Sequence, residues 1–160
     1  DILCVPGGFG VAPALADQEI VGFVREQAKG AEWVTSVCTG AFILGAAGLL
    51  QGKRATTHWG YAHLLPLVGA VHEDARVVRD GNLLTAGGVT SGIDFALELI
   101  AAAKGPELAQ TLQLALEYDP APPFPGGHPR SAPPAIVEGL KARVYSKSAV
   151  EMEGAINALR

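Results

Sequence analysis

The sequence has little of several features that mark particular classes of protein. It contains two cysteines in 160 residues, too few for the disulfide framework of a small secreted domain. Its formal net charge of −4 argues against a nucleic-acid surface, which usually shows as a basic stripe. No apolar run approaches the roughly 18 residues that a membrane helix requires, and the chain does not open on a signal-peptide pattern. These absences predict a cytoplasmic protein that binds neither nucleic acid nor membranes.

Apolar residues and glycine are abundant. Hydrophobic residues make up 49% of the chain, and the 20 glycines suit the tight turns and close helix-sheet packing of parallel α/β folds. The length predicts one domain over residues 1–160. Proline recurs through 119–134, which argues against a helix or a central strand and predicts an extended arm there. A final helix is expected over 135–160.

The first third of the chain has the pattern of a strand, a helix and a second strand. An apolar run predicts a buried strand at 2–5, a helix is expected over 17–30, and a β-branched run predicts a strand at 32–37. Short connections between these elements imply a right-handed crossover and parallel pairing. The carboxyl ends of both strands then meet at one edge of the sheet, which is where open parallel sheets bind ligands.

Cys38 follows the second strand, at the point where a small-residue, helix-favouring run begins and continues to about Leu50. Gly7 and Gly8 follow the first strand, so we expect them to lie beside Cys38 at the shared sheet edge. A cysteine at such a junction resembles the nucleophile elbow of hydrolases, and the N–H groups and dipole of the following helix should lower the thiol pKa. A small buried side chain is the alternative. Cys4, inside the first apolar run, is predicted to be a buried structural residue.

A second unit of strand, glycine loop and helix follows downstream. The run 76–85 has two β-rich arms about an Asp-Gly-Asn turn, which is typical of a hairpin. A glycine-rich loop then leads into a helix expected over 93–103, with Ser91 and Asp94 spaced as a capping box. This loop should reach the same sheet edge as Cys38.

The chain has four histidines, and their spacing does not indicate a metal site. His58, beside Trp59, can serve as an acid-base group or a metal ligand, with a hydrogen-bonded structural role as the alternative. His63, His72 and His128 show no ligand spacing with one another. The sequence therefore predicts no metal and no cofactor.

Several motifs together resemble one known family. They are Val5–Gly8, Ser36–Gly40, Gly52–Trp59, Val78–Asn82, Gly87–Phe95 and Gln113–Phe124. With these, the chain resembles the DJ-1/PfpI superfamily and, within it, the isocyanide hydratase group. The resemblance implies a flavodoxin-like α/β sandwich, similar to class I glutamine amidotransferases, with a mostly parallel sheet. It also implies a homodimer that hydrates a small-molecule isocyanide to an N-substituted formamide through a thioimidate, as a hydro-lyase.

The resemblance also suggests roles for individual residues. Cys38 corresponds to the nucleophile, with N–H contacts from Thr39 and from the loop at Gly7 and Gly8. Gly87, Val89 and His58 are expected to contact the substrate or its oxyanion.

Two features of the chain depart from the pattern of the superfamily and bear on the expected activity. Superfamily proteases and some glyoxalases carry a histidine directly after the nucleophile, where this chain has Thr39, which disfavours a Cys-His hydrolase. The hydratases share a carboxylate near the end of the family's first strand, and this chain is expected to start after that strand. Because a general acid-base group is typically worth about 10² to 10⁴ in rate, we expect turnover at least about 10²-fold slower without it.

Two alternatives remain open on the sequence. One is the ligand-sensing domain of an AraC-type transcription regulator, although the single helical stretch after Pro134 is too short for the two helix-turn-helix units of such a protein. The other is a redox sensor similar to DJ-1, in which Cys38 is oxidised to a sulfinic acid.

Overall fold

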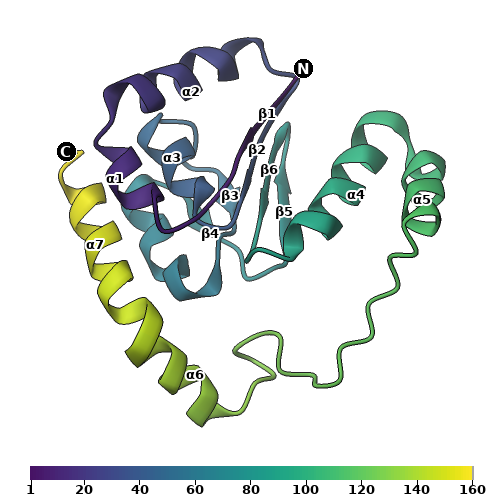
Figure 1. Cartoon of the computed structure of the whole chain (residues 1–160). Coiled ribbons are helices and arrows are strands. Elements are labelled where there is room, and N and C mark those ends of the chain that lie inside the picture. Colours follow the sequence, from purple (N-terminus) through teal and green to yellow (C-terminus); the bar gives the residue numbers. More distant parts are fainter. Residues whose placement is uncertain (160) are drawn as a thin grey trace.

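The computed structural model describes residues 1–159 and builds a mixed sheet with helices on both faces (Figure 1). The strand order is β1-β2-β6-β5, with the β1–β2 and β2–β6 pairs parallel and the β5–β6 pair antiparallel. The strands are β1 (Ile2–Val5), β2 (Trp33–Val37), β5 (Val77–Asp80) and β6 (Leu83–Ala86). A separate parallel pair joins β3 (Arg54–Ala55) to β4 (Val71–His72). The expected mostly parallel α/β sheet is confirmed.

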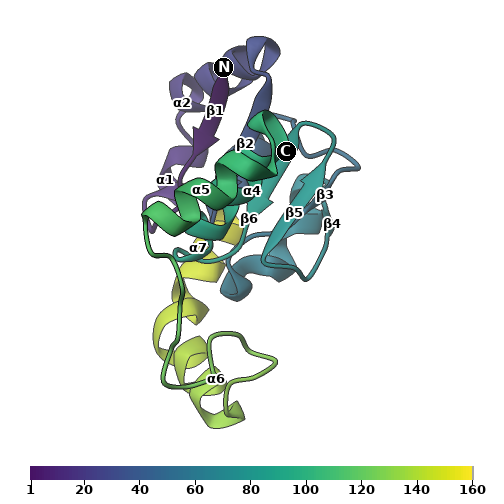
Figure 2. The same ribbon diagram turned by 90° about the vertical axis from the view of Figure 1, so that its right-hand side faces the viewer.

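Helices cover the two faces unequally. One face carries α1 (Val11–Leu15), α2 (Gln18–Gly30), α3 (Gly40–Ala46), the 3₁₀ helix η1 (Trp59–Val68) and α7 (Ser146–Asn157). The other face carries α4 (Ser91–Lys104), with α5 (Pro106–Ala115) packed against α4 (Figure 2). The larger core therefore lies on the first face, where Leu15, Phe42, Leu44 and Leu65 are fully buried. A smaller core under α4 contains Trp33, Leu84, Phe95 and Leu99.

Local signals near the helix and hairpin ends are mostly confirmed. Asp17 caps α2 by accepting hydrogen bonds from the N–H groups of Glu19 (2.9 Å) and Ile20 (3.2 Å). The hairpin turns at Gly81, whose φ of 66° lies in the left-handed region that glycine adopts readily. Helix α3 is shorter than expected, because the chain leaves it after Ala46 through a series of turns.

The expected capping box at the start of α4 is wrong. Ser91 is the first residue of the helix and is fully buried, and the residue in the capping position, Thr90, makes no side-chain cap. Asp94 points elsewhere, because the guanidinium of Arg76 and the hydroxyl of Tyr118 donate hydrogen bonds to its carboxylate.

The buried setting predicted for Cys4 is also wrong. Strand β1 is the edge strand of the described sheet, and Cys4 is exposed. Ile2, two residues before it on the same face, is 54% exposed. The core under α4 contains residues of β2, β5 and β6 but none of β1, so an apolar run alone did not show which face would be covered.

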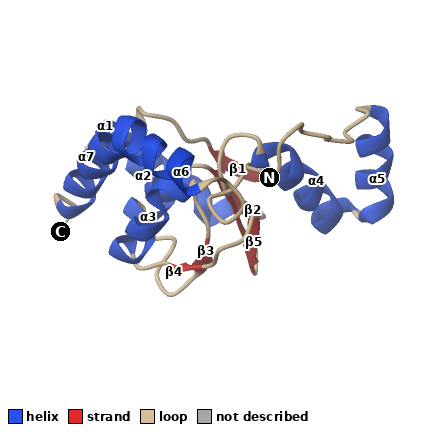
Figure 3. Ribbon diagram, turned by 90° about the horizontal axis from the view of Figure 1, so that it is seen from below, coloured by secondary structure: helices blue, strands red, loops and turns tan. Residues whose placement is uncertain are grey.

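The proline-rich segment is extended, as expected. Residues 119–133 form no helix or strand and run from α5 to α6 (Pro134–Leu140) (Figure 2). Helix α6 continues through a π-helical turn, η2 (Lys141–Tyr145), into α7, which returns to pack beside α1 (Figure 3). The C-terminal helix is thereby placed against the N-terminal half of the chain. Within residues 1–159, no helix has the length and apolar character needed to span a membrane.

Candidate active site

Cys38 lies at the sharp junction between β2 and α3. Its φ of 58° places it in the left-handed region, which is uncommon for a residue other than glycine and often marks functional sites. The Cys38 N–H lies within hydrogen-bond distance of the carbonyls of Ala86 (3.0 Å) and Gly87 (2.9 Å), so the end of β6 holds the turn in place. This strand, strained turn and helix form the elbow that the sequence predicted.

Two glycines allow the chain to pack closely around Cys38. A Cβ on Gly40 would lie 2.2 Å from the carbonyl oxygen of Val5. A Cβ on Gly7 would lie 2.7 Å from the Cβ of Cys38 and 2.6 Å from the backbone nitrogen of Thr39. The loop after β1 is therefore in direct contact with the elbow, and the predicted meeting of the two strand ends is confirmed.

The Cys38 sulfur is surrounded by hydrogen-bond donors but is substantially buried. The backbone N–H groups of Thr39 and Val89 and the hydroxyl of Thr39 favour the thiolate, yet burial outweighs them and raises the pKa of the Cys38 thiol above its usual value. The lowered pKa expected from the sequence is thus wrong for this structure. The helix start was predicted correctly, but α3 has only seven residues, and desolvation of the half-buried Cys38 side chain outweighs its hydrogen-bond donors.

Thr39 joins the elbow to the glycine loop through its side chain. Its hydroxyl oxygen accepts a hydrogen bond from the N–H of Gly8 (2.9 Å) and lies 3.2 Å from the Gly8 carbonyl oxygen. A hydroxyl has one hydrogen to donate, so Thr39 donates either to that carbonyl or to the Cys38 sulfur. Thr39 is 3% exposed, so this choice is made out of contact with bulk water.

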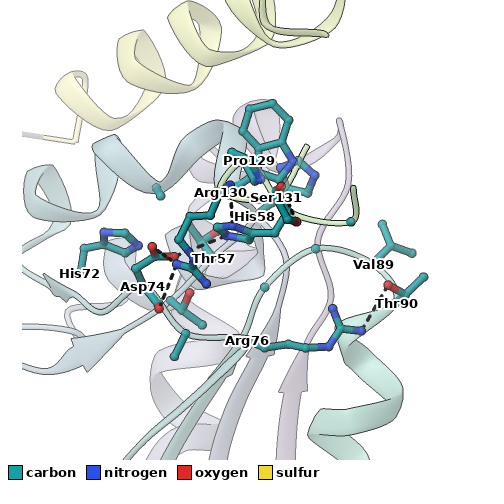
Figure 4. A pocket seen from close by; sticks show the side chains of 18 of the residues that line it. Thr57, His58, His72, Asp74, Arg76, Val89, Thr90, Pro129, Arg130 and Ser131 are labelled. Carbon is teal, nitrogen blue, oxygen red and sulfur yellow. Dashed lines mark hydrogen bonds and ion pairs between the residues drawn. The ribbon is translucent and has the colours of Figure 1, made fainter. Parts of the chain in front are cut away.

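A cavity of about 780 Å³ is lined by the segments that carry His58, Val89 and Arg130 (Figure 4). Of the predicted site residues, His58, Gly87 and Val89 line it, whereas Cys38, Thr39, Gly7 and Gly8 are not among its lining residues. The structure therefore divides the predicted site into an elbow group and a cavity group. The two groups meet at Thr57, which lines the cavity and whose hydroxyl donates to the Cys38 carbonyl oxygen at 2.7 Å, and at Val89, whose N–H faces the Cys38 sulfur.

Charged side chains from distant segments line the outer part of the cavity. Arg130 of the proline-rich arm forms an ion pair with Asp74 (Figure 4). His128 Nε2 lies 3.4 Å from the same carboxylate. The Arg130 hydrogen bond holds the pKa of Asp74 below its usual value. Arg76 pairs with Asp94 on the other side of the cavity. None of these charged residues was predicted, because no local sequence pattern indicates that the proline-rich arm returns to the loop that carries Asp74.

His58 forms part of the cavity wall within an aromatic cluster. Its Nδ1 accepts a hydrogen bond from the N–H of Gly60 at 3.1 Å. Ring centroids lie 5.7 Å away for Trp59, 5.9 Å for Tyr61 and 5.0 Å for Tyr145. Burial lowers the pKa of His58, which favours the neutral ring. In residues 1–159, no three or more His, Cys, Asp and Glu side chains are grouped to hold a metal ion.

Comparisons with known proteins match the elbow and its surroundings. The model of the DJ-1/PfpI family matches residues 1–102, which include Cys38, His58 and Val89. The chain is 58% identical to an isonitrile hydratase of Pseudomonas putida over 89% of its length. It is 36% identical to the transcriptional regulator CdhR of Pseudomonas aeruginosa over 68% of its length, but covers 33% of that protein.

Among solved structures, a ThiJ/PfpI family protein from Pseudomonas syringae superposes with a TM-score of 0.93 and 39% identity, covering 97% of this chain. The chain spans 63% of the length of the P. putida protein and 64% of that of the P. syringae protein. Fold, elbow motif and sequence similarity agree over more than half of the chain. The chain belongs to the DJ-1/PfpI family.

Proposed function

We propose that this protein is an isocyanide hydratase with Cys38 as its nucleophile. The observation that carries the proposal is the left-handed Cys38 at a strand-helix junction, with N–H groups from Thr39 and Val89 directed at its sulfur. The similarity to the P. putida isonitrile hydratase supports the choice of reaction, because it extends over 89% of the chain.

In the first step, the Cys38 thiolate attacks the terminal carbon of the isocyanide. A carbon–sulfur bond forms, and the carbon takes up a proton to give a thioimidate, R–N=CH–S–Cys. The N–H groups of Thr39 and Val89 stabilise the thiolate before attack. Gly7 and Gly8 lie beside the elbow, and the Gly8 N–H donates to the Thr39 hydroxyl, which orients that side chain next to the sulfur.

In the second step, water adds to the thioimidate carbon. The carbon–sulfur bond then breaks, the nitrogen keeps a proton, and the N-substituted formamide leaves while the thiolate is regenerated. The sum is R–NC plus H₂O giving R–NH–CHO, and no redox change or cofactor is required. The cavity beyond Val89 accommodates the N-substituent, with His58 and Gly87 in its wall.

Both steps need an acid-base group close to Cys38. The influences on the Cys38 pKa are burial and the donors of Thr39 and Val89, and no carboxylate is among them. His58 is the histidine in the cavity wall closest in sequence to the elbow, and its neutral ring offers one N–H.

We propose a homodimer of single-domain chains in the cytoplasm as the working form. The family resemblance supports the dimer, and apolar side chains such as Val89 and Phe124, each 77% exposed, offer surface for a partner. Free cysteines at positions 4 and 38 suit a reducing compartment. Small isocyanides are the proposed substrates.

The test is to incubate the purified protein with an aryl isocyanide and to quantify the N-aryl formamide by liquid chromatography. We expect formamide from the wild type and from Cys4→Ala, and none above the uncatalysed rate from Cys38→Ala. Formamide production that survives in Cys38→Ala, or is absent from all three proteins while their circular dichroism shows them folded, would overturn the proposal.

A further inference from the structure

We propose that Tyr145, carried by the C-terminal helix, is a positioning residue that holds the His58 ring against the Cys38 site. The inference rests on the proposed function and adds a residue that lies outside the 1–102 segment matched by the family model. It gives the C-terminal helix a part in activity beyond packing.

Tyr145 contacts the cavity wall through both its ring and its hydroxyl. The hydroxyl oxygen lies 3.5 Å from Nε2 of His58, at the long end of hydrogen bonding, and the two ring centroids are 5.0 Å apart. The ring also lies on Gly60, where an added Cβ would stand 2.9 Å from Cγ of Tyr145. The position of the Tyr145 ring therefore depends on Gly60 in η1, which lets the ring approach the backbone.

The hydrogen bonds of His58 indicate which ring nitrogen carries the proton. Nδ1 accepts from the N–H of Gly60, so it carries no hydrogen, and a neutral imidazole must then hold its proton on Nε2. The Tyr145 hydroxyl oxygen faces this nitrogen and is the acceptor for that N–H. Gly60 and Tyr145 together thus select one tautomer and one orientation of the ring.

The orientation of His58 matters because its ring touches the loop that faces the nucleophile. A Cβ on Gly88 would lie 2.8 Å from Cδ2 of His58, so the imidazole edge lies directly on Gly88. The next residue, Val89, directs its N–H at the Cys38 sulfur. The contacts therefore run from Tyr145 through His58 and Gly88 to an N–H that stabilises the thiolate. The Cys38 charge also contributes to raising the pKa of Tyr145, after burial and Tyr61, which is consistent with this proximity.

The shape of the C-terminal helix places Tyr145 at this point. The π-helical turn Lys141–Tyr145 ends at Tyr145, and such wide turns inside α-helices are frequent at functional sites. One turn later, the hydroxyl of Ser148 pairs with that of Tyr61 at 2.7 Å, which fixes the helix against η1. Residues three positions apart lie on the same face of a helix, so Tyr145 and Ser148 both face η1.

The test compares Tyr145→Phe with Tyr61→Phe. Each variant keeps its ring and loses one hydroxyl contact between the C-terminal helix and the segment His58–Tyr61, but only Tyr145→Phe removes the contact to the His58 nitrogen. In Tyr145→Phe we expect kcat for an aryl isocyanide to fall about tenfold with KM little changed, because the Val89 N–H is displaced relative to the sulfur. In Tyr61→Phe we expect a lower melting temperature and kcat within about twofold of wild type.

Nitrogen-15 NMR of histidine-labelled protein supplies the second readout, with the His58 signals assigned from His58→Gln. Wild type and Tyr61→Phe should show the Nε2–H tautomer, whereas Tyr145→Phe should show a mixture of tautomers. An unchanged kcat and tautomer in Tyr145→Phe would overturn the proposal, as would an equal loss of kcat in Tyr61→Phe. If the wild type produces no formamide, the proposed function fails, and the tautomer measurement still decides the role of Tyr145.

Discussion

Cys4 lies in β1 and Cys38 directly follows the neighbouring strand β2, and the two residues differ in exposure and in backbone geometry. Cys4 is in the middle of β1, where it stands opposite Thr35, and its side chain is exposed. Cys38 comes directly after β2, has left-handed backbone geometry, and holds its sulfur among N–H donors. Exposure would select Cys4 as the reactive thiol, whereas the position at a strand end selects Cys38. On the proposed function, the backbone turn at Cys38, more than access to solvent, decides which thiol attacks the substrate.

Removing each thiol in turn gives the largest expected difference between them. Cys38→Ala should lose at least about 10³-fold in kcat, because a nucleophile that acts with its partners accounts for most of the catalysis. Cys4→Ala should retain the wild-type rate within about twofold, since Cys4 is exposed in the middle of β1 and is not among the residues that line the cavity. Formamide assays with both variants at equal folded concentration make the measurement. A large loss of kcat in Cys4→Ala would contradict the assignment of the nucleophile to Cys38 alone.

The contact between the end of β1 and the start of α3 can be broken at Gly40. Gly40→Ala places a methyl group 2.2 Å from the Val5 carbonyl oxygen, a backbone atom that cannot turn aside. We expect the free energy of unfolding to fall by roughly 3 kcal/mol, at the upper end for overpacking. Gly22→Ala in α2 is the matched control, because an added Cβ there meets nothing within 4 Å and should stabilise the helix by about 0.5 to 1 kcal/mol.

Urea denaturation of the two glycine variants gives both values. If Gly40→Ala were as stable as Gly22→Ala, the close approach of the Val5 carbonyl to the elbow would be wrong.

The pH dependence of alkylation sharpens the comparison of the two thiols. Burial raises the Cys38 pKa, so its thiolate fraction is small at neutral pH and grows as the pH rises toward that pKa. Iodoacetamide should therefore label exposed Cys4 before Cys38 at pH 7, and the Cys38 rate should increase by about tenfold per pH unit above it. Thr39→Val should slow Cys38 further at a given pH, since it removes a donor to the thiolate.

Peptide mapping by mass spectrometry at several pH values follows each adduct. A Cys38 rate that is fast and independent of pH near neutrality would show that the donors outweigh burial, as the sequence pattern had indicated.

The sequence predicted what depends on local pattern and chain topology. The meeting of Gly7 with Cys38 follows from two parallel strands with a short crossover, and this contact was found. The setting of Cys4 was wrong because an apolar run does not show whether a strand lies at an edge. The pKa of Cys38 was wrong because a helix start is visible in sequence whereas the depth of the sulfur is not.

Contacts made by the C-terminal third were beyond sequence reasoning. Asp74 and Arg130 are 56 positions apart, and His58 and Tyr145 are 87 apart. An arm rich in proline has no periodicity that fixes its direction, so its return to the cavity depends on side-chain pairing at its far end. The part of the cavity wall that residues 125–131 and Lys141 contribute is therefore visible only in the folded chain.

The pair between Asp74 and Arg130 gives the smallest expected effect on stability. Asp74 and Arg130 are both exposed, so Asp74→Asn should lower the free energy of unfolding by less than about 1 kcal/mol, with less effect at high salt. Glu26→Gln, which breaks the exposed Lys29 pair within α2, is the matched control of similar size. Because Arg130 lowers the Asp74 pKa in the folded state, the stabilisation is present above the usual carboxyl pKa of about 3.9 and is lost as pH falls through the lowered value.

The two variants should nevertheless differ at the arm. Asp74→Asn removes the carboxylate that Arg130 and His128 share, so limited proteolysis should cut residues 119–133 faster than in wild type. Glu26→Gln should leave that rate unchanged, because its pair lies on α2, far along the chain from the arm. Equal cleavage in all three proteins would show that packing, rather than the Asp74 pair, holds the arm over the cavity.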